Sequence, residues 1–164
     1  MFCAEELAEV GWRGPVCQVN HSHTSRIGTV RGLHFQRAPH GEMKLVTCIR
    51  GAIWDVAVDL REDSPTRWSW HAEELSAANG RALLIPEGFA HGFQVLRAES
   101  ELIYLHSAPY VPNAEDGVHP GDPKLAISWP MAVSGLSSRD ASLPYLGLPG
   151  RGSTSTVVTA PPTS

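Results

Sequence analysis

The stretch of the sequence richest in candidate catalytic side chains is residues 30–44, VRGLHFQRAPHGEMK, which contains Arg31, His34 and Lys44. His34 is flanked by apolar residues, and an apolar run follows Lys44 directly. Burying a basic or titratable side chain costs free energy unless the group is paired or has a function. The stretch therefore predicts two strands, joined by a turn, that carry a functional site. The alternative is that His34 is only a hydrogen-bonded structural residue.

A second motif lies downstream, where residues 80–91 have the spacing G-x5-P-x-G-x2-H of the second motif of cupin barrels, ending at His91. In metal cupins the first motif supplies two histidines and a carboxylate. Here His34 resembles the first histidine, but Gln36 and Lys44 stand where the other two ligands would be. An ammonium repels a divalent cation, and two histidines are too few ligands for a stable site. The sequence therefore predicts no bound metal and no other cofactor.

The elements that must position these residues follow from hydrophobic periodicity. Residues 52–61 alternate as a strand, with apolar side chains on one face and two aspartates on the other. Further strands are predicted at residues 16–20, 29–36, 43–50, 67–75, 82–85 and 101–106, and strands 29–36 and 43–50 are expected to form the core pair. A turn is predicted at residues 21–25, a hairpin turn at Asn79-Gly80 and a short helix at residues 3–10. Seven or so short strands with few helices predict an all-β fold, a cupin-type jelly-roll barrel with short flanking helices. Such a small barrel can enclose one ligand-sized cavity.

The length of 164 residues suits one domain, which we expect to span residues 1–146. Residues 147–164 are rich in Gly, Ser, Thr and Pro without apolar periodicity, so they are predicted to form a disordered tail. A net charge of −4 without a Lys/Arg run argues against nucleic-acid or membrane partners. Three cysteines without a CxxC pair, and no signal-peptide pattern, predict a reduced, cytoplasmic protein.

Several motifs together resemble one family. They are VRGLHFQ (30–36), KLVTC (44–48), DVAVDLR (55–61), IPEGFAHGF (85–93), YLHSAPY (104–110), DPKLAISWP (122–130) and SSRD (137–140). From about Phe2 to Pro144 the chain is similar to the dTDP-4-dehydrorhamnose 3,5-epimerases, which are metal-free cupins of deoxysugar biosynthesis. The resemblance implies epimerisation at C3, C5 or both of a nucleotide-linked 4-keto-6-deoxyhexose through an enolate. It also implies a homodimer, although the exchanged N-terminal strand of the family dimer lies upstream of the position of Met1.

Epimerisation beside a ketone needs a base on one face of the carbon, an acid on the other, and positive charge near the enolate oxygen. Histidine is a suitable base because its ordinary pKa, about 6.5, lies near working pH. The resemblance implies that His34 is this base, that Asp140 fixes its tautomer, that Tyr104 is the acid and that Lys44 faces the enolate oxygen. It places Arg31 near the sugar or the phosphates. The other implied substrate-binding residues are Gln18, Asn20, Gln36, His91 and Tyr110.

Other readings of these residues remain open. Without the resemblance, Tyr104 could equally be a barrel-lining tyrosine, although alternation along 101–106 puts it on the same side as Leu102 and His106. Two other functions compete with the epimerase: a non-catalytic nucleotide-sugar-binding cupin, and a metal-dependent cupin oxygenase. The second is opposed by Gln36 and Lys44. Structural roles are predicted for Asp55 and Asp59, solvent-facing positions for His21, His23, His40 and His119, and packing for Trp54, Trp68, Trp70 and Trp129.

Overall fold

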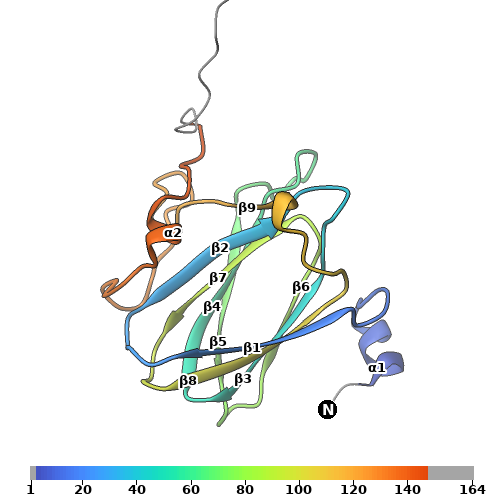
Figure 1. The fold of residues 1–164 in the computed structure, drawn as a ribbon, viewed down its shortest axis with the longest axis horizontal. Helices are drawn as coiled ribbons and strands as arrows, with labels where there is room; N and C mark the ends of the chain where they lie inside the picture. The colour runs from blue at the N-terminus through green and yellow to red at the C-terminus, as the bar shows by residue number, and fades with distance from the viewer. Residues whose placement is uncertain (1–2, 148–164) are drawn as a thin grey trace, which may run out of the picture.

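The computed structural model describes residues 3–147, which fold into two antiparallel sheets facing each other (Figure 1). The four-stranded sheet has the order β1 (Gln18–Thr24), β8 (Ser100–His106), β3 (Lys44–Arg50), β6 (Ala82–Ile85). The five-stranded sheet has the order β5 (Trp70–Ser76), β4 (Ala52–Asp59), β7 (Phe89–Val95), β2 (Val30–Gln36), β9 (Glu115–Gly117). The helical segments are α1 (Ala4–Glu9), α2 (Ser138–Ala141) and a 3-10 turn at Pro112–Ala114. The predicted all-β jelly roll with short helices is confirmed.

The space between the sheets is filled at one end by apolar side chains. These come from alternate positions of each strand, because successive side chains of a strand point to opposite faces. The fully buried members of this cluster include Val46, Ile53, Leu75, Ile85, Val95 and Leu102. At about 25 cal/mol per Å² of buried apolar surface, such side chains each contribute roughly 1.5–3 kcal/mol to folding. The other end of the barrel is left to polar side chains and forms a cavity.

A second apolar cluster covers the outer face of the five-stranded sheet. Val56 and Val58 of β4 pack there beneath Val118 and Leu125 of the segment that follows β9. The four tryptophans predicted to pack, Trp54, Trp68, Trp70 and Trp129, all lie against this cluster. The five-stranded sheet is therefore buried on both faces, which fixes the position of β2 and β7 beside the cavity.

The predicted pairing of strands 29–36 and 43–50 is wrong. β2 pairs with β7 and β9, whereas β3 pairs with β6 and β8 in the other sheet. Alternation reveals which residues are strands but not which sheet each strand joins, and residues 37–43 carry the chain across from one sheet to the other. As a result, the catalytic candidates on β2 and β3 face each other across the barrel.

Three local predictions also need correction. Residues 21–24 continue β1 as an edge strand rather than forming a turn, and pairing runs to Thr24 opposite Ser100. This part of the strand was not predicted because its side chains are polar and mostly exposed, so they show no apolar alternation. Residues 67–69 precede β5, which begins only at Trp70. Asn79 does close a turn by accepting from the backbone N–H groups of Ser76 and Arg81, but the strands on either side join different sheets, so no hairpin forms.

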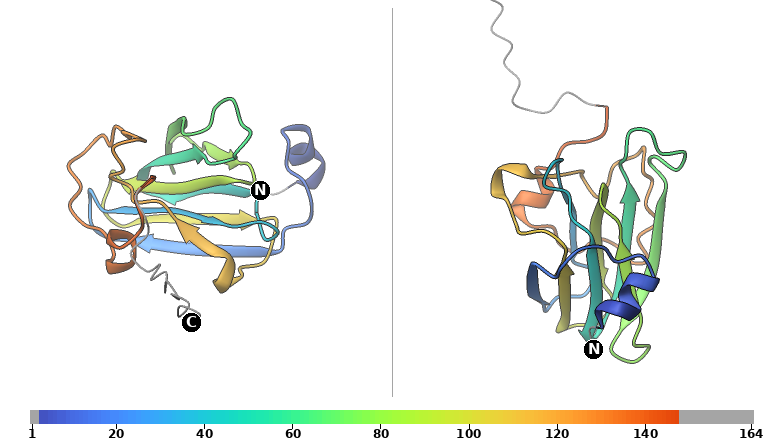
Figure 2. Two further views of the ribbon diagram at one scale, coloured as in Figure 1. Left: turned by 90° about the horizontal axis from the view of Figure 1, so that it is seen from above. Right: turned by 90° about the vertical axis from the view of Figure 1, so that its right-hand side faces the viewer.

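The short helices lie beyond opposite ends of the strands, with α1 at one end and α2 at the other, as Figure 1 and the left view of Figure 2 show. α1 agrees with the helix predicted at residues 3–10 and buries no side chain. The tail predicted at residues 147–164 lies, apart from Gly147, outside the described residues. Across residues 3–147, no helix combines the length and the apolar character needed to span a bilayer.

Candidate active site

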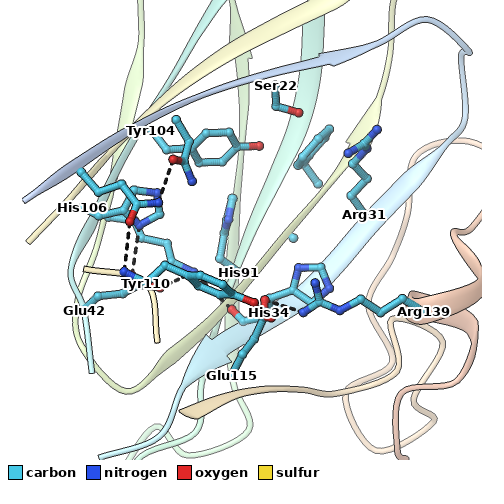
Figure 3. Close-up of a pocket in the computed structure, with 15 residues that line it drawn as sticks. Ser22, Arg31, His34, Glu42, His91, Tyr104, His106, Tyr110, Glu115 and Arg139 are labelled. Carbon is cyan, nitrogen blue, oxygen red and sulfur yellow. Dashed lines mark hydrogen bonds and ion pairs between the residues drawn. The ribbon is translucent and has the colours of Figure 1, made fainter. Parts of the chain in front are cut away.

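A cavity of about 360 Å³ opens between the two sheets at the polar end of the barrel (Figure 3). The four-stranded sheet supplies one wall, in which β1, β3 and β8 contribute alternate residues. The five-stranded sheet supplies the facing wall from β2 and β7. The connection from β2 to β3, the loop after β8, the start of β9 and α2 surround the mouth. The lining residues are Gln18, Asn20, Ser22, Lys44, Tyr104 and His106 on the first wall, Arg31, His34, His91, Gly92 and Phe93 on the second, and Glu42, Tyr110, Glu115 and Arg139 at the mouth.

His34 on β2 forms a tight pair with Asp140 of α2. Its Nε2 lies 2.6 Å from Asp140 Oδ1, and the Asp140 side chain is only 3% exposed. Burial alone would raise the pKa of this carboxyl group, but the hydrogen bond and charge of His34, with a donor at Ser137, outweigh it and lower the pKa. Ser137 also caps α2, because its Oγ accepts from the Asp140 N–H at 3.0 Å. The cap holds Asp140 in place, and Asp140 orients the ring of His34 toward the cavity.

Tyr104 reaches the same cavity from the opposite wall, on β8. Alternation along this strand buries Leu102 in the core and turns Tyr104 and His106 toward the cavity, as predicted. Burial, and then the negative charge of Asp55, raise the pKa of the Tyr104 phenol above its ordinary value. The phenol is therefore kept protonated. A protonated hydroxyl on one wall thus faces an imidazole on the other.

His91 and Asp55 form a second histidine–carboxylate pair beneath Tyr104. His91 Nε2 lies 2.7 Å from Asp55 Oδ1, and both side chains are buried. The ring centroids of His91 and Tyr104 lie 5.7 Å apart in an edge-on arrangement. Asp55 was predicted to be structural. Its carboxylate supports a cavity-lining histidine, and its remaining oxygen, Oδ2, has no hydrogen-bond partner within residues 3–147.

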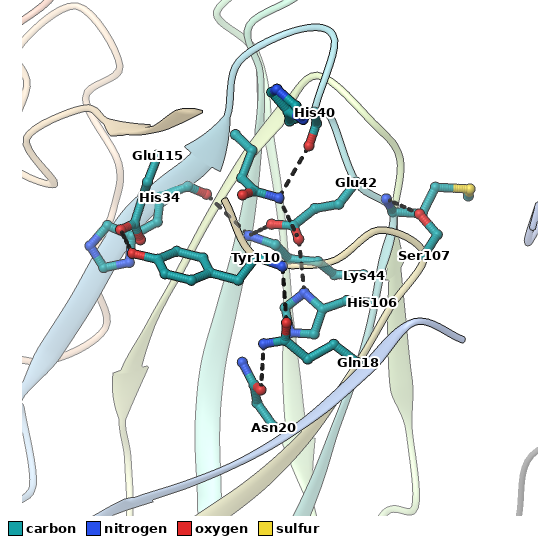
Figure 4. Close-up of polar contacts among 12 residues, drawn as sticks. Gln18, Asn20, His34, His40, Glu42, Lys44, His106, Ser107, Tyr110 and Glu115 are labelled. Carbon is teal, nitrogen blue, oxygen red and sulfur yellow. Dashed lines mark hydrogen bonds and ion pairs between the residues drawn. The ribbon is translucent and has the colours of Figure 1, made fainter. Parts of the chain in front are cut away.

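Lys44 is held beside the cavity by a carboxylate that sequence reasoning missed (Figure 4). Its Nζ lies 3.1 Å from Glu42 Oε1 and donates to the backbone oxygen of His34 at 3.4 Å. The other carboxylate oxygen, Glu42 Oε2, accepts from Nδ1 of His106 at 3.1 Å. Burial raises the pKa of Glu42, but His106 and Lys44 together lower it further than burial raises it. Glu42 therefore remains ionised between two cavity-lining side chains.

The mouth of the cavity is organised by Glu115. Tyr110 O–H donates to Glu115 Oε2 at 2.5 Å, and the guanidinium of Arg139 pairs with the same carboxylate. The hydrogen bond to Glu115 raises the pKa of Tyr110, and Arg139 helps to lower that of Glu115 against the effect of burial. Gln18 Oε1 accepts from the backbone N–H of Tyr110 at 3.0 Å, which ties the loop to β1.

A second cavity of about 430 Å³ adjoins the first and shares Arg31, His34 and Arg139 with it, and Asp140 lines this second cavity alone. It adds the guanidinium of Arg26 to those of Arg31 and Arg139. Arginine side chains bind phosphate oxygens through paired, charge-assisted hydrogen bonds. The basic side chains near His34 could therefore hold the phosphates of a ligand.

Most of the predicted site residues lie together. Gln18, Asn20, Arg31, His34, Lys44, His91, Tyr104 and Tyr110 all line the first cavity, and Asp140 lies directly behind His34. Gln36 is the exception, because its amide is buried and used internally. It donates to the backbone oxygens of His40 and Pro109 and to Glu42, and it accepts from the N–H of Val111. Gln36 therefore holds the loop that carries Tyr110 and is not in a position to line the cavity.

Six further residues at or beside the site were not predicted to take part: Ser22, Glu42, Asp55, His106, Glu115 and Arg139. Alternation along β1 and β8 could have identified Ser22 and His106. Asp55, Glu115 and Arg139 depend on contacts with other segments of the chain. Glu42 likewise bonds to the distant His106, although its other partner, Lys44, is only two residues away. Within the described part of the chain, no group of three or more His, Cys, Asp or Glu side chains could hold a metal ion.

Comparison with known proteins identifies relatives along almost the whole described region. The family model for dTDP-4-dehydrorhamnose 3,5-epimerase matches residues 1–147. A dTDP-4-dehydrorhamnose 3,5-epimerase of Sinorhizobium fredii is 46% identical over 143 residues, covering 87% of this chain and 71% of the relative. A dTDP-4-dehydrorhamnose 3-epimerase of Streptomyces niveus is 48% identical over 125 residues, which are 76% of this chain but only 60% of that protein.

A solved structure of an epimerase has a fold similar to that of this chain. The crystal structure of dTDP-4-dehydrorhamnose 3,5-epimerase from Bacillus anthracis, with TDP and PPi bound, superimposes with a TM-score of 0.86 at 42% identity. The match covers 88% of this chain and 83% of that one.

Proposed function

The chain belongs to the dTDP-4-dehydrorhamnose 3,5-epimerase family, and on that basis we propose that it epimerises C3, C5 or both of a nucleotide-linked 4-keto-6-deoxyhexose, of the dTDP-4-dehydro-6-deoxy-D-glucose type. One observation carries the proposal. The imidazole of His34, backed by Asp140, and the protonated phenol of Tyr104 line one cavity from opposite sheets. Inversion of a carbon requires a base and an acid on opposite faces of that carbon.

The first step is removal of a proton. Asp140 accepts a hydrogen bond from His34 Nε2–H, so the lone pair on Nδ1 is available to take the proton bonded to C3 or C5. The electrons of the broken C–H bond form a carbon–carbon double bond, and those of the C4 carbonyl move onto its oxygen to give an enolate. The Lys44 ammonium stabilises this oxygen, and Asp140 stabilises the imidazolium. Such preorganised charges are among the largest contributions to enzymatic rate.

The second step returns a proton to the opposite face. Tyr104 donates its hydroxyl proton to the carbon, the ketone re-forms, and the configuration at that carbon is inverted. The phenolate then regains a proton from solvent, and His34 releases the one it took. The raised pKa of Tyr104 keeps the phenol protonated between turnovers, as an acid of this kind requires.

The residues proposed to bind the nucleotide are assigned by their charge and by their aromatic or amide groups. Arg31, with Arg26 and Arg139 beside it, suits the diphosphate. Tyr110, Gln18 and Asn20, which also line the cavity, offer an aromatic face and amide groups to the remaining parts of the ligand. His91, held by Asp55, lies beside Tyr104 in the cavity and is assigned to orienting the sugar.

The outer face of the four-stranded sheet supports a homodimer. A row of apolar side chains crosses this face, because Val19 pairs with Leu105 and Leu105 pairs with Leu45. Val19 is 59% exposed and the nearby Ile49 is 45% exposed. Contiguous exposed apolar surface of this kind is typical of subunit interfaces. We assign this face to contact with a second copy of the chain.

The test is incubation with dTDP-4-dehydro-6-deoxy-D-glucose in deuterated water, followed by proton NMR. Loss of the C3 or C5 proton signal, with appearance of an epimer, is the expected result. The carbons that take up deuterium decide between a 3,5-epimerase and a single-carbon epimerase such as the Streptomyces niveus relative. A protein that binds the nucleotide sugar without exchanging either proton would be a binding cupin, and the proposal would be wrong.

A further inference from the structure

We propose that Glu42 is a positioning residue of this reaction, whose carboxylate fixes the ammonium of Lys44 and ties its placement to the mouth of the cavity. The inference rests on the proposed function and extends it to a side chain to which neither the sequence nor the relatives' names give a role. Glu42 lies on the connection that crosses between the sheets, two residues before Lys44 on β3.

The contacts of Glu42 are divided between its two oxygens. Oε1 lies 3.1 Å from Lys44 Nζ. Oε2 accepts from His106 Nδ1 at 3.1 Å and from Gln36 Nε2 at 3.2 Å. The Glu42 and Lys44 side chains are each only 9% exposed, so water does not screen the pair as it would on the surface. A buried carboxylate with several donors is held in one orientation, and it holds its donors in turn.

This arrangement matters for Lys44 because a lysine side chain is a flexible stem with a mobile point charge. Two of its three N–H groups are directed to Glu42 Oε1 and to the backbone oxygen of His34. The third is left for the cavity, which Lys44 lines. Glu42 therefore selects the direction in which Lys44 presents a donor to the enolate oxygen. A displacement of about 1 Å in such a group can cost about 100-fold in rate.

The same carboxylate connects Lys44 to the loop that carries Tyr110, through Gln36. Figure 4 shows Glu42 between Lys44 and His106, with Tyr110 nearby. Gln36, bonded to Glu42, donates to the backbone oxygen of Pro109 at 3.2 Å and accepts from the N–H of Val111 at 2.6 Å. These two residues flank Tyr110. The ammonium and the loop of the ligand-facing tyrosine therefore belong to one hydrogen-bonded network, in which Glu42 holds Lys44 and Gln36 holds the loop through its own backbone contacts.

The experiment is a double-mutant cycle on the full chain with Glu42→Gln and Lys44→Ala. The rate of deuterium uptake by the keto-sugar measures catalysis, and calorimetric titration with dTDP measures binding of the nucleotide alone. Glu42→Gln should lower the exchange rate by about 10- to 100-fold, while the Kd for dTDP changes less than about twofold. In the Lys44→Ala background, Glu42→Gln should have less than about a threefold further effect, because residues that act through one another are not additive.

The matched control is Glu101→Gln. Glu101 also accepts from a histidine and pairs with a cation, through His21 and Arg50, but it lies outside the cavity. This variant should exchange deuterium at the wild-type rate. If Glu42→Gln does not fold, Glu42→Asp keeps the charge and shortens the side chain by one methylene. It should then show the same loss of rate with dTDP binding retained.

The outcomes separate this inference from the function on which it rests. Wild-type exchange with fully multiplicative effects of Glu42→Gln and Lys44→Ala would overturn the positioning role and leave the epimerase standing. An unchanged rate in Glu42→Gln would do the same. Absence of exchange in the wild type would overturn the proposed function itself, and the positioning role with it.

Discussion

Replacing Asp140 by Asn tests the proposed base most selectively, because the amide keeps the shape of the carboxylate and removes its charge. The 2.6 Å contact with His34 Nε2 becomes an ordinary hydrogen bond to an amide oxygen. A hydrogen bond to a charged partner contributes about 1.5–3 kcal/mol, against roughly 1 kcal/mol for a neutral one. The difference applies in the transition state, where His34 becomes cationic. We expect the exchange rate to fall by about 3- to 30-fold, since each 1.4 kcal/mol is roughly tenfold.

The assay compares initial rates of deuterium uptake at saturating keto-sugar for wild type, Asp140→Asn and Ser137→Ala. Ser137→Ala keeps the charge of the carboxylate but removes the cap that holds Asp140, which should cost about 1 kcal/mol of stability and a smaller loss of rate than Asp140→Asn. Equal exchange rates for wild type and Asp140→Asn would refute the argument that the carboxylate stabilises a cationic His34. A fall in dTDP affinity parallel to the fall in rate would indicate general damage to the site.

The remaining predictions concern stability, proton transfer, metals and assembly. The pKa of the Asp140 carboxyl group is lower in the folded protein than its ordinary value of about 3.9. Its ionisation therefore stabilises the fold above that ordinary value, and this contribution is lost as pH falls through the folded pKa. The difference in melting temperature between wild type and Asp140→Asn should shrink below about pH 4 for this reason. Tyr104→Phe should lower the rate of inversion by about 10²–10⁴-fold, while some deuterium uptake with retained configuration persists. His34→Ala should lose both inversion and deuterium uptake. Deuterium uptake at the wild-type rate in His34→Ala would show that the base is misassigned. EDTA should leave the exchange rate unchanged, because Gln36 and Lys44 occupy two cupin ligand positions; elemental analysis finding about one metal per chain would contradict this. The wild type should scatter light as a dimer, and Leu105→Glu should shift it toward monomer; a monomeric wild type at tens of micromolar would exclude the proposed interface.

The fold class and much of the cavity lining could be predicted because they depend on local patterns. Alternation identified the strands, and the motif resemblance supplied the residues on them that carry chemistry. Pairing could not be predicted in the same way, since β2 and β3 have the same alternation whether they are neighbours or face each other. Polar strands were also missed, as at residues 21–24 of β1, because their exposed face shows no apolar signal.

The carboxylates of the site were the least predictable part. Asp55 was assigned a structural role, and Glu42 and Glu115 were not singled out, although each holds a side chain at the cavity. A carboxylate in a sequence is usually a solvated surface group, and only a tertiary contact shows that it is buried with a partner. Gln36 illustrates the converse. Its position in the motif pointed to the ligand, but its amide is used to hold the loop after β8.

The placement of β2 and β3 in different sheets lets the barrel present side chains to a substrate from opposite sides. Had β2 and β3 been neighbours in one sheet, His34 and Lys44 would approach a substrate from the same side. Because the chain crosses between sheets at residues 37–43, His34 lies on one wall while Lys44 and Tyr104 lie on the other. A planar enolate bound between the walls would then have its base on one face and its acid on the opposite face. In the proposed mechanism the crossing connection therefore supplies the opposite placement of base and acid, and Glu42 lies on that connection.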